Sequence, residues 1–226
     1  MCGRYVLTSP PEAVAALFEI SGDVPNYPPR YNIAPTQPVP VVHCGVDGTG
    51  PLKLSLMRWG LVPHWSKGPD SRFSMINARA ETLASKPAYR GAFRYRRCLL
   101  PANGFYEWKA LPKGPRQPYF IAMGDGGLIF FAGLWEHWLG PDGSELASVT
   151  IVTTGATGVV REVHDRMPVI LCVDEGRDWI SGAGGRQGLA ELLDAPAPIG
   201  LTAVPVSRRV NDPTFDDPSC LEPSEG

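Results

Sequence analysis

The chain has 226 residues, 43% of them hydrophobic, so it can bury a substantial core in one large domain or two small ones. Its net charge of -2 excludes a global attraction to nucleic acid, and any nucleic-acid site must be a local basic patch. The five cysteines are widely spaced and form no C-x-x-C pair, which argues against a disulfide framework or a zinc site.

Other compositional features bear on secondary structure and location. The 25 glycines and 24 prolines predict short strands, many turns and few long helices. No apolar run approaches about 20 residues, and the amino terminus has no basic segment followed by an apolar one. We therefore expect a cytoplasmic or nucleoid-associated protein that is a monomer and has no membrane partner.

The amino terminus, Met1-Cys2-Gly3-Arg4-Tyr5, carries unusual chemistry. If Met1 is removed, Cys2 holds an amine and a thiol two carbons apart, with reference pKa values of about 8 and about 8.5. Such a pair suits an aldehyde, because the amine forms an imine and the thiol closes it to a thiazolidine. Arg4 adds a planar cation suited to phosphate. The alternative is a start codon followed by an ordinary buried cysteine.

The first part of the chain predicts one helix, one long loop and two paired strands. Ser9-Pro10-Pro11-Glu12 has the pattern of a capping box and predicts an amphipathic helix that continues to Ile20. Residues 23–37 are rich in proline and aromatic residues, and a loop of this length is either functional or a plain surface crossover. The alternation in 52–59 predicts a strand paired with 39–46.

Two stretches between residues 59 and 82 combine aromatic and polar groups. Trp59 and Trp65 either close a core or provide a platform for base stacking, which is worth about 1 to 3 kcal/mol per base. If the chain is extended near residue 78, Asn77 and Arg79 project from one face and suit a sugar oxygen beside a phosphate. Alternatively, Asn77 caps a following helix and Arg79 is solvated.

An arginine cluster and an unusual strand follow. Residues 94–97 contain three arginines, which form either a solvated edge or the local basic patch that the net charge does not supply. In residues 104–108, alternation places Glu107 among large apolar rings whichever face is buried. Burial raises a carboxyl pKa toward neutrality, which suits a general acid or base. Alternatively, Glu107 pairs at the rim with Lys109 or an arginine.

The second half of the chain reads as strands, a histidine motif and two short helices. The expected elements are a hairpin of 117–123 and 128–133, strands at 148–154, 169–172 and 201–206, and helices at 174–180 and 186–193. His164 stands beside Asp165 and Arg166 just before a strand, so it is either placed to transfer protons or structural in its turn. No boundary divides residues 1–211, whereas the acidic, proline-rich segment 212–226 predicts a mobile tail.

Taken together, the motifs resemble those of the SRAP family, the SOS response-associated peptidase-like proteins that shield abasic sites in single-stranded DNA. The matching stretches, in the family's order, are Met1-Cys2-Gly3-Arg4-Tyr5, Arg30-Tyr31-Asn32-Ile33-Ala34-Pro35, Trp59-Gly60-Leu61-Val62-Pro63, Asn77-Ala78-Arg79-Ala80-Glu81-Thr82, Gly104-Phe105-Tyr106-Glu107-Trp108 and His164-Asp165-Arg166-Met167-Pro168. They run through nearly the whole chain. Any one of them is weak, but all of them in order are hard to obtain by chance.

The resemblance implies a single α+β domain, mainly antiparallel and barrel-like with a few short helices, and a groove for single-stranded DNA. It implies a covalent crosslink from Cys2 to the abasic aldehyde, with Asn77, Glu107 and His164 as catalytic partners. It further implies phosphate contacts from Arg4, Arg79 and Arg161, stacking by Trp65, and neither metal nor cofactor. The chain departs from the family at Asn103, where many members have Asp, and after Trp65, where some carry a second tryptophan.

Three other functions fit parts of the pattern. One is a cysteine peptidase with Cys2 as nucleophile and His164 as base, whose limited form releases Met1. An amidotransferase also begins Met-Cys-Gly, but Asn103-Gly104 is not followed by the glutamate that such enzymes need. The third is a DNA-binding module without covalent chemistry, whose binding would be salt-sensitive and reversible.

Overall fold

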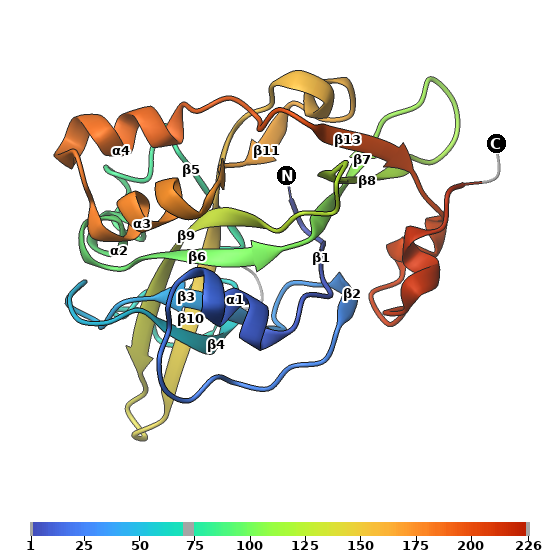
Figure 1. Cartoon of the computed structure of the whole chain (residues 1–226). Helices are drawn as coiled ribbons and strands as arrows, with labels where there is room; N and C mark the ends of the chain where they lie inside the picture. Colours follow the sequence, from blue (N-terminus) through green and yellow to red (C-terminus); the bar gives the residue numbers. More distant parts are fainter. Residues whose placement is uncertain (1, 70–74, 225–226) are drawn as a thin grey trace.

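The computed structural model describes residues 2–69 and 75–224, which form two sheets with short helices around them (Figure 1). The smaller sheet contains, in spatial order, β13 (Leu201–Pro205), β8 (Gln117–Met123), β7 (Gly104–Lys109), β1 (Tyr5–Leu7) and β2 (Arg30–Ile33). All neighbouring strands in it are antiparallel. Because β1 lies between β7 and β2, the start of the chain is fixed on both sides.

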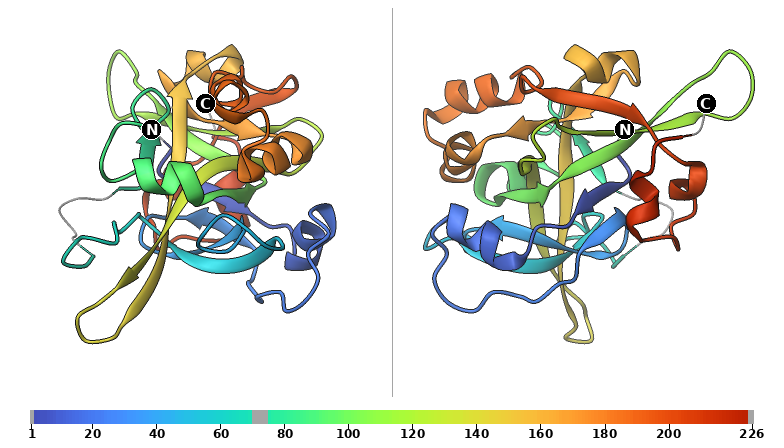
Figure 2. Two further views of the ribbon diagram at one scale, coloured as in Figure 1. Left: turned by 90° about the vertical axis from the view of Figure 1, so that its left-hand side faces the viewer. Right: turned by 45° about the vertical axis from the view of Figure 1, so that its right-hand side comes forward.

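The larger sheet closes on itself. Its ring contains β10 (Glu145–Gly155), β4 (Lys53–Trp59), β3 (Pro38–His43), β6 (Arg97–Ala102) and β9 (Ile129–Leu139), and β9 pairs back onto β10. Further strands β5 (Asn77–Arg79) and β11 (Arg166–Pro168) pair with β10, and β12 (Ile170–Leu171) pairs with β9. The expected α+β, mainly antiparallel and barrel-like fold is confirmed. The long β9–β10 hairpin projects beyond the body (Figure 2).

Aromatic contacts join the two sheets. Tyr5 of β1 packs edge-on against Trp59 and Phe131, with ring centroids 5.4 and 5.8 Å apart, and all three side chains are buried. Edge-to-face pairs of this kind stabilise beyond the apolar area that they bury. The start of the chain therefore belongs to the main core and is not a loose end.

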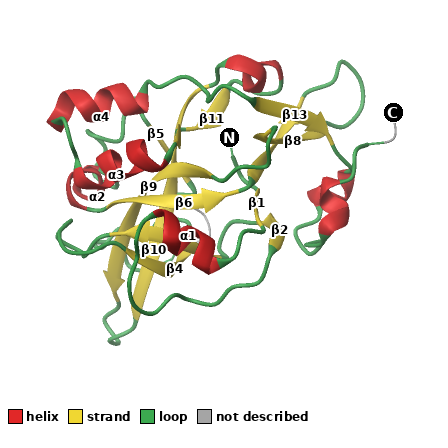
Figure 3. Cartoon of the chain, in the orientation of Figure 1, coloured by secondary structure: helices red, strands yellow, loops and turns green. Residues whose placement is uncertain are grey.

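The helices are short and cover a second core. They are α1 (Pro11–Leu17), α2 (Arg90–Tyr95), α3 (Val173–Ser181) and α4 (Gly185–Leu193), with 3-10 turns η1 (Gly158–Glu162), η2 (Arg208–Asn211) and η3 (Pro218–Leu221). Helices α2, α3 and α4 gather at one side of the barrel (Figure 3). The buried Trp179 of α3 anchors them by donating its indole N–H to the carbonyls of Cys98 and Gly133.

Two local expectations are wrong. Strands β8 and β9 follow one another but form no hairpin, since β8 pairs with β7 and β13 whereas β9 pairs with β6, β10 and β12. Glycines can reverse the chain without deciding which strands pair. Helix α1 has Pro10 as its N-cap with no side-chain cap. The Ser9 hydroxyl instead accepts a hydrogen bond from the side-chain amide of Asn103. The Oδ1 of the same amide accepts from the backbone N–H groups of Thr8 and Ser9.

The segment expected to be a mobile tail packs on the smaller sheet. Asp216 accepts hydrogen bonds from the backbone N–H groups of Tyr31 (2.6 Å) and Asn32 (2.8 Å), and it pairs with the Arg30 guanidinium. Cys220 is fully buried beside Tyr106. Because β2 is an edge strand with exposed N–H groups, a carboxylate in the tail gains partners by covering that edge.

Candidate active site

Cys2 is placed by the strand that follows it. Residues Tyr5 and Val6 pair with Phe105 and Gly104 of β7, so Cys2 lies just beyond the point where the two strands meet. Its side chain is fully buried, and its sulfur is 3.8 Å from the Arg4 carbonyl. Burial, and next the negative charge of Glu107, raise the pKa of the Cys2 thiol far above its ordinary value. The thiol is therefore protonated in the resting protein.

Gly104 is required where β7 pairs with β1 and β8. A Cβ at this position would lie 2.5 Å from the Phe120 ring and 2.7 Å from the Ile121 carbonyl. Neither contact is tolerable, because both distances are shorter than real Cβ contacts and the carbonyl belongs to the backbone of the neighbouring strand. Glycine thus lets β7 approach β8 closely, immediately before the strand delivers Glu107.

Glu107 is buried, as the alternation of β7 predicts. Phe105 and Glu107 share the inner face. Tyr106 and Trp108 lie on the other face, where the Tyr106 hydroxyl donates to the Tyr31 carbonyl of β2 and the Trp108 indole N–H donates to Asn211 of the C-terminal segment. The Glu107 side chain is 2% exposed, and this burial raises the pKa of its carboxyl. The alternative of a rim glutamate paired with Lys109 is wrong.

His164 faces Glu107 from the turn that follows η1. Its Nε2 lies 3.8 Å from a Glu107 carboxylate oxygen, and its Nδ1 lies 2.9 Å from the backbone nitrogen of Arg166. The same Nδ1 is 2.9 Å from the Asp165 carboxylate, so the ring lies between the buried Glu107 carboxyl group on its Nε2 side and an exposed carboxylate on its Nδ1 side. An imidazole between two carboxyl groups is well placed to carry protons.

Asn77 reaches the same place from β5. The strand pairs in parallel with β10, so the alternative of a helix cap is wrong. The Nδ2 of Asn77 donates to the backbone carbonyl of Cys2 at 2.9 Å. Within the described part of the chain no donor reaches its buried Oδ1. A buried acceptor without a donor is costly, and at a site of this kind it marks a position that a ligand can fill.

The four predicted catalytic residues therefore come together from four separate elements. Asn77 contacts Cys2, His164 contacts Glu107, and the Glu107 charge acts on the Cys2 thiol. The arrangement places a nucleophile, a proton carrier and an amide in one buried site. It can add a nucleophile to a carbonyl carbon and move the protons that this addition requires.

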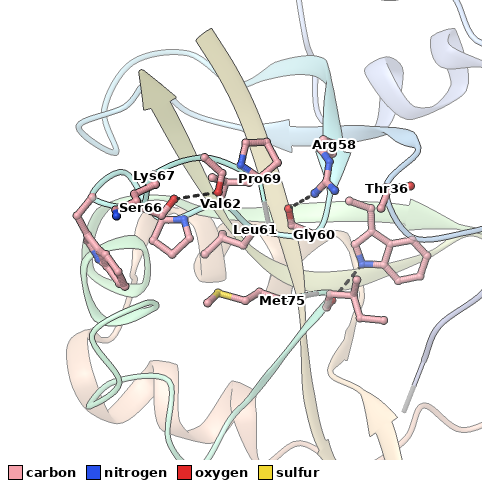
Figure 4. Close-up of a pocket in the computed structure, with 14 residues that line it drawn as sticks. Thr36, Arg58, Gly60, Leu61, Val62, Ser66, Lys67, Pro69 and Met75 are labelled. Carbon is pink, nitrogen blue, oxygen red and sulfur yellow. Dashed lines mark hydrogen bonds between the residues drawn. The ribbon is translucent and has the colours of Figure 1, made fainter. Parts of the chain in front are cut away.

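The residues predicted to contact DNA have two different settings. Arg79 and Arg161 are exposed, Arg79 two residues after Asn77 and Arg161 beside a 380 Å³ pocket that His164 also lines. Trp65 is 59% exposed and lines a largely apolar pocket of about 850 Å³, which also includes Ile76 (Figure 4). All three side chains can reach a ligand, so their role in DNA binding stays a prediction.

Arg4, which is predicted to contact phosphate, is bonded to the C-terminal segment. Its guanidinium donates to Asn32 Oδ1 (2.9 Å) and to the carbonyls of Val210 (2.7 Å) and Asn211 (3.3 Å). These bonds use three of the five N–H donors of the guanidinium. Arg4 therefore fastens the start of β1 to the C-terminal segment, and its contact with phosphate stays a prediction.

The sequence analysis gave no role to Arg166, which links two of the motifs. It forms a two-pronged ion pair with Glu81 and donates to the Thr153 carbonyl at 2.6 Å. Glu81 follows Asn77 on one segment, and Arg166 follows His164 on another. A signal existed, because both residues lie inside the motifs that identified the family, but only the fold shows that they pair.

Fold and site together define an α+β protein with a cysteine near its amino terminus that is buried beside a carboxyl group, an imidazole and an amide. The chain belongs to the SRAP family, because the family model described as SOS response associated peptidase (SRAP) matches residues 1–213.

Named relatives match over most of their length. The chain is 37% identical to the abasic site processing protein YoqW of Bacillus subtilis, covering 98% of this chain and 99% of the relative. It is 31% identical to the abasic site processing protein HMCES of Xenopus tropicalis, covering 98% of this chain and 78% of the relative.

Solved structures show the same fold. A phage-related protein of Bordetella bronchiseptica has a TM-score of 0.73 and 34% identity, over 92% of this chain and 95% of its own. A protein of Bacteroides thetaiotaomicron superposes with a TM-score of 0.86 at 22% identity, over 99% of this chain and 100% of its own, which supports the fold alone. Within the described residues, each helix is too short or too polar to cross a membrane.

Proposed function

We propose that this protein captures abasic sites in single-stranded DNA by forming a covalent thiazolidine with Cys2, and so shields the lesion. The observation that carries the proposal is the meeting of Cys2, Asn77, Glu107 and His164 in a chain whose relatives are named abasic site processing proteins. The protein acts as a cytoplasmic, nucleoid-associated monomer and needs no metal or cofactor.

The chemistry begins with removal of Met1, which frees the Cys2 amine. The abasic sugar is mostly a closed hemiacetal, so the ring must open before the aldehyde can react. His164 protonates the ring oxygen while the hydroxyl group on the anomeric carbon loses its proton, and the ring opens to give the aldehyde. The amine adds to that aldehyde, and loss of water gives an imine while Glu107 holds the amine and carries its proton. The thiol then adds across the imine: a carbon–sulfur bond forms, and the thiol proton ends on nitrogen.

The electrostatics of the site support this order of steps. Because burial and the Glu107 charge raise the pKa of the Cys2 thiol, the thiolate is not the first nucleophile. Burial also raises the Glu107 pKa, which lets this carboxyl hold a proton closer to neutral pH. Asn77 orients the Cys2 backbone with its amide N–H, and its Oδ1 accepts from the new amine or from a sugar hydroxyl.

A denaturing gel tests the proposal. Processed protein is mixed with a single-stranded oligonucleotide that contains one abasic site, alongside an intact oligonucleotide, a Cys2→Ala protein and a protein that retains an amino-terminal tag. A band that survives denaturation is expected only with the abasic strand and only with a free Cys2. A Cys2→Ser protein that gives an equally stable adduct would contradict the thiazolidine, since serine leaves only a reversible imine.

A limited peptidase activity, release of Met1 from the chain itself, is the second function that we propose. It is favoured by the family's description as a peptidase and by the proximity of Cys2 to Glu107. The raised thiol pKa argues against a general cysteine peptidase, which needs a ready thiolate. Mass spectrometry of wild-type and Glu107→Gln proteins, expressed without a methionine aminopeptidase, should show Met1 lost from the wild type alone.

A further inference from the structure

A second cavity lies on the side of the barrel covered by α2, α3 and α4, at the left of Figure 1. It has a volume of about 800 Å³ and is formed by α2, the end of α3 and the start of α4. Its charged lining residues are all arginines, namely Arg90, Arg94, Arg97 and Arg186. A cavity with several cations and no acidic lining residue, in a chain of net charge -2, is a local attractor for anions.

Arg97 is the structural member of this set. It donates to the carbonyls of Phe93 (2.7 Å), Arg94 (3.0 Å), Trp179 (2.5 Å) and Ile180 (3.1 Å). These carbonyls belong to α2 and α3, so Arg97 holds the two helices in fixed positions. The walls of the cavity are therefore set before any ligand arrives.

The other three arginines are available to a ligand. Arg90, Arg94 and Arg186 are exposed, and among the residues that the structure describes none of them has a carboxylate partner. The Arg94 guanidinium lies over the ring of Tyr95, 5.1 Å from its centroid, and that ring is 46% exposed. Planar guanidinium groups beside an exposed ring suit phosphates and a base that stacks near them.

Glycine keeps the middle of the cavity open. Gly182 ends α3 with a φ of +76°, and a Cβ there would lie 2.6 Å from the Arg97 guanidinium. At Gly185, which begins α4, nothing lies within 4 Å of the position of a Cβ. Gly182 thus leaves room for the Arg97 guanidinium, and Gly185 adds no side chain to the cavity.

The cavity is joined to the candidate active site by one short segment. Tyr89 donates its hydroxyl to the backbone carbonyl of Asn77 at 3.3 Å, and the next residue, Arg90, begins α2. The chain between them runs from the exposed Arg79 past the exposed Lys86, and Ala84 on this segment lines the cavity. Two exposed basic residues, Arg79 and Lys86, thus lie on the segment between the candidate active site and the cavity, and Glu81 between them is paired with Arg166.

We propose that the arginine cavity formed by Arg90, Arg94 and Arg186 binds phosphates of the same DNA strand at a distance from the lesion. It would act as a second anchor for the strand that leaves the active site past Arg79. The inference rests on the proposed function for its ligand class. An acidic peptide is the competing occupant, but the short segment that joins the cavity to the candidate active site, with Arg79 and Lys86 exposed along it, favours nucleic acid.

Binding of intact oligonucleotides tests this anchor without requiring any reaction at Cys2. Fluorescence anisotropy would compare strands of about 6 and about 25 nucleotides over a salt series. The variant Arg90→Gln/Arg94→Gln/Arg186→Gln is compared with the control Lys113→Gln/Arg116→Gln/Arg208→Gln, which removes the same charge from exposed positions elsewhere. A third variant with lysine at the three cavity positions keeps the charge.

We expect the glutamine variant to bind the long oligonucleotide at least about tenfold more weakly. The slope of log K against log salt concentration should fall in magnitude by about 2, because three phosphate contacts are lost. The short strand, the control variant and the lysine variant should stay close to wild type. An equal loss of affinity for both oligonucleotides, or no loss for the long one, would overturn the proposal. So would a poly-glutamate peptide that binds wild type but not the glutamine variant while DNA affinity is unchanged. Failure of crosslinking with normal binding would count against the proposed function alone.

Discussion

Strands β2 and β5 each carry an asparagine and an arginine two positions apart, yet the two asparagines are in opposite states. Asn32 of β2 is fully satisfied: its Nδ2 donates to the carbonyls of Val210, Asp212 and Phe215, and its Oδ1 accepts from Arg4. Asn77 of β5 makes one side-chain bond, to Cys2, and its buried Oδ1 has no donor within the described residues. Similar sequence motifs thus serve different ends.

The difference shows how to separate structural from functional polar groups. A satisfied amide in the core stabilises the fold and leaves nothing for a ligand. An amide whose acceptor has no donor destabilises the free protein. The protein is stabilised again when a ligand supplies the missing donor. The Arg30-Tyr31-Asn32 motif therefore holds the C-terminal segment, whereas Asn77 leaves an acceptor open to a ligand beside Cys2.

The largest expected effect is on stability, at β2. Asn32→Ala should lower the free energy of unfolding by about 3 kcal/mol, because buried carbonyls and the Arg4 guanidinium lose their partner. Chemical denaturation measures this loss. Gln187→Ala, an exposed amide in α4, is the control and should change little. An Asn32→Ala protein as stable as wild type would remove the basis of the comparison.

At β5, substitution of Asn77 should change the rate of crosslinking and not the stability. Asn77→Ala should slow crosslinking about 50-fold, equivalent to roughly 2.3 kcal/mol, because the Cys2 backbone and the substrate lose a hydrogen-bonding partner. Its stability should stay near wild type, since the loss of one hydrogen bond is offset by removal of an unsatisfied oxygen. Single-turnover gels and thermal melts measure the two quantities. A large loss of stability with an unchanged rate would reverse the assignment.

Glu107 gives a pH test of the same site. Because burial raises its folded pKa, the native state holds the proton more tightly than the unfolded state. The stabilisation is complete below the unfolded value of about 4.3 and is lost as pH rises through the folded pKa. Glu107→Gln cannot ionise, so its Tm should exceed the wild-type Tm by about 3 °C at pH 7, with a smaller difference at pH 4. Glu12→Gln, at an exposed carboxylate with no ion pair among the described residues, is the matched control.

The smallest expected effect concerns the docked tail. Asp216→Asn keeps the shape of the side chain but weakens its bonds to Tyr31 and Asn32 and its ion pair with Arg30, which is partly exposed. We expect a loss of about 1 kcal/mol in unfolding free energy. Limited proteolysis within residues 212–224 should become faster. Proteolysis at the wild-type rate would show that Asp216 does not hold the segment.

The sequence predicted features whose cause is local. Alternation identified Glu107 as buried, and the β3–β4 pair and helices α3 and α4 lie within a few residues of their expected positions. It failed where partners are distant. No local pattern shows that Arg4 donates to the distant Val210 carbonyl, and β8 resembles half of a hairpin until the sheets assign it elsewhere. The Cys2 thiol pKa likewise depends on burial that no local pattern shows.

The bond between Arg4 and the Val210 carbonyl joins residues 206 positions apart, with consequences for synthesis of the chain. The amino terminus leaves the ribosome first, but the surroundings of β1 are complete only when β7 and the last residues have followed. At about 5 to 20 residues per second, that takes about 10 to 45 s. The end of the chain that carries Cys2 is therefore the first to be made and among the last to be assembled, so a nascent or truncated chain carries Cys2 without the residues that surround it in the fold.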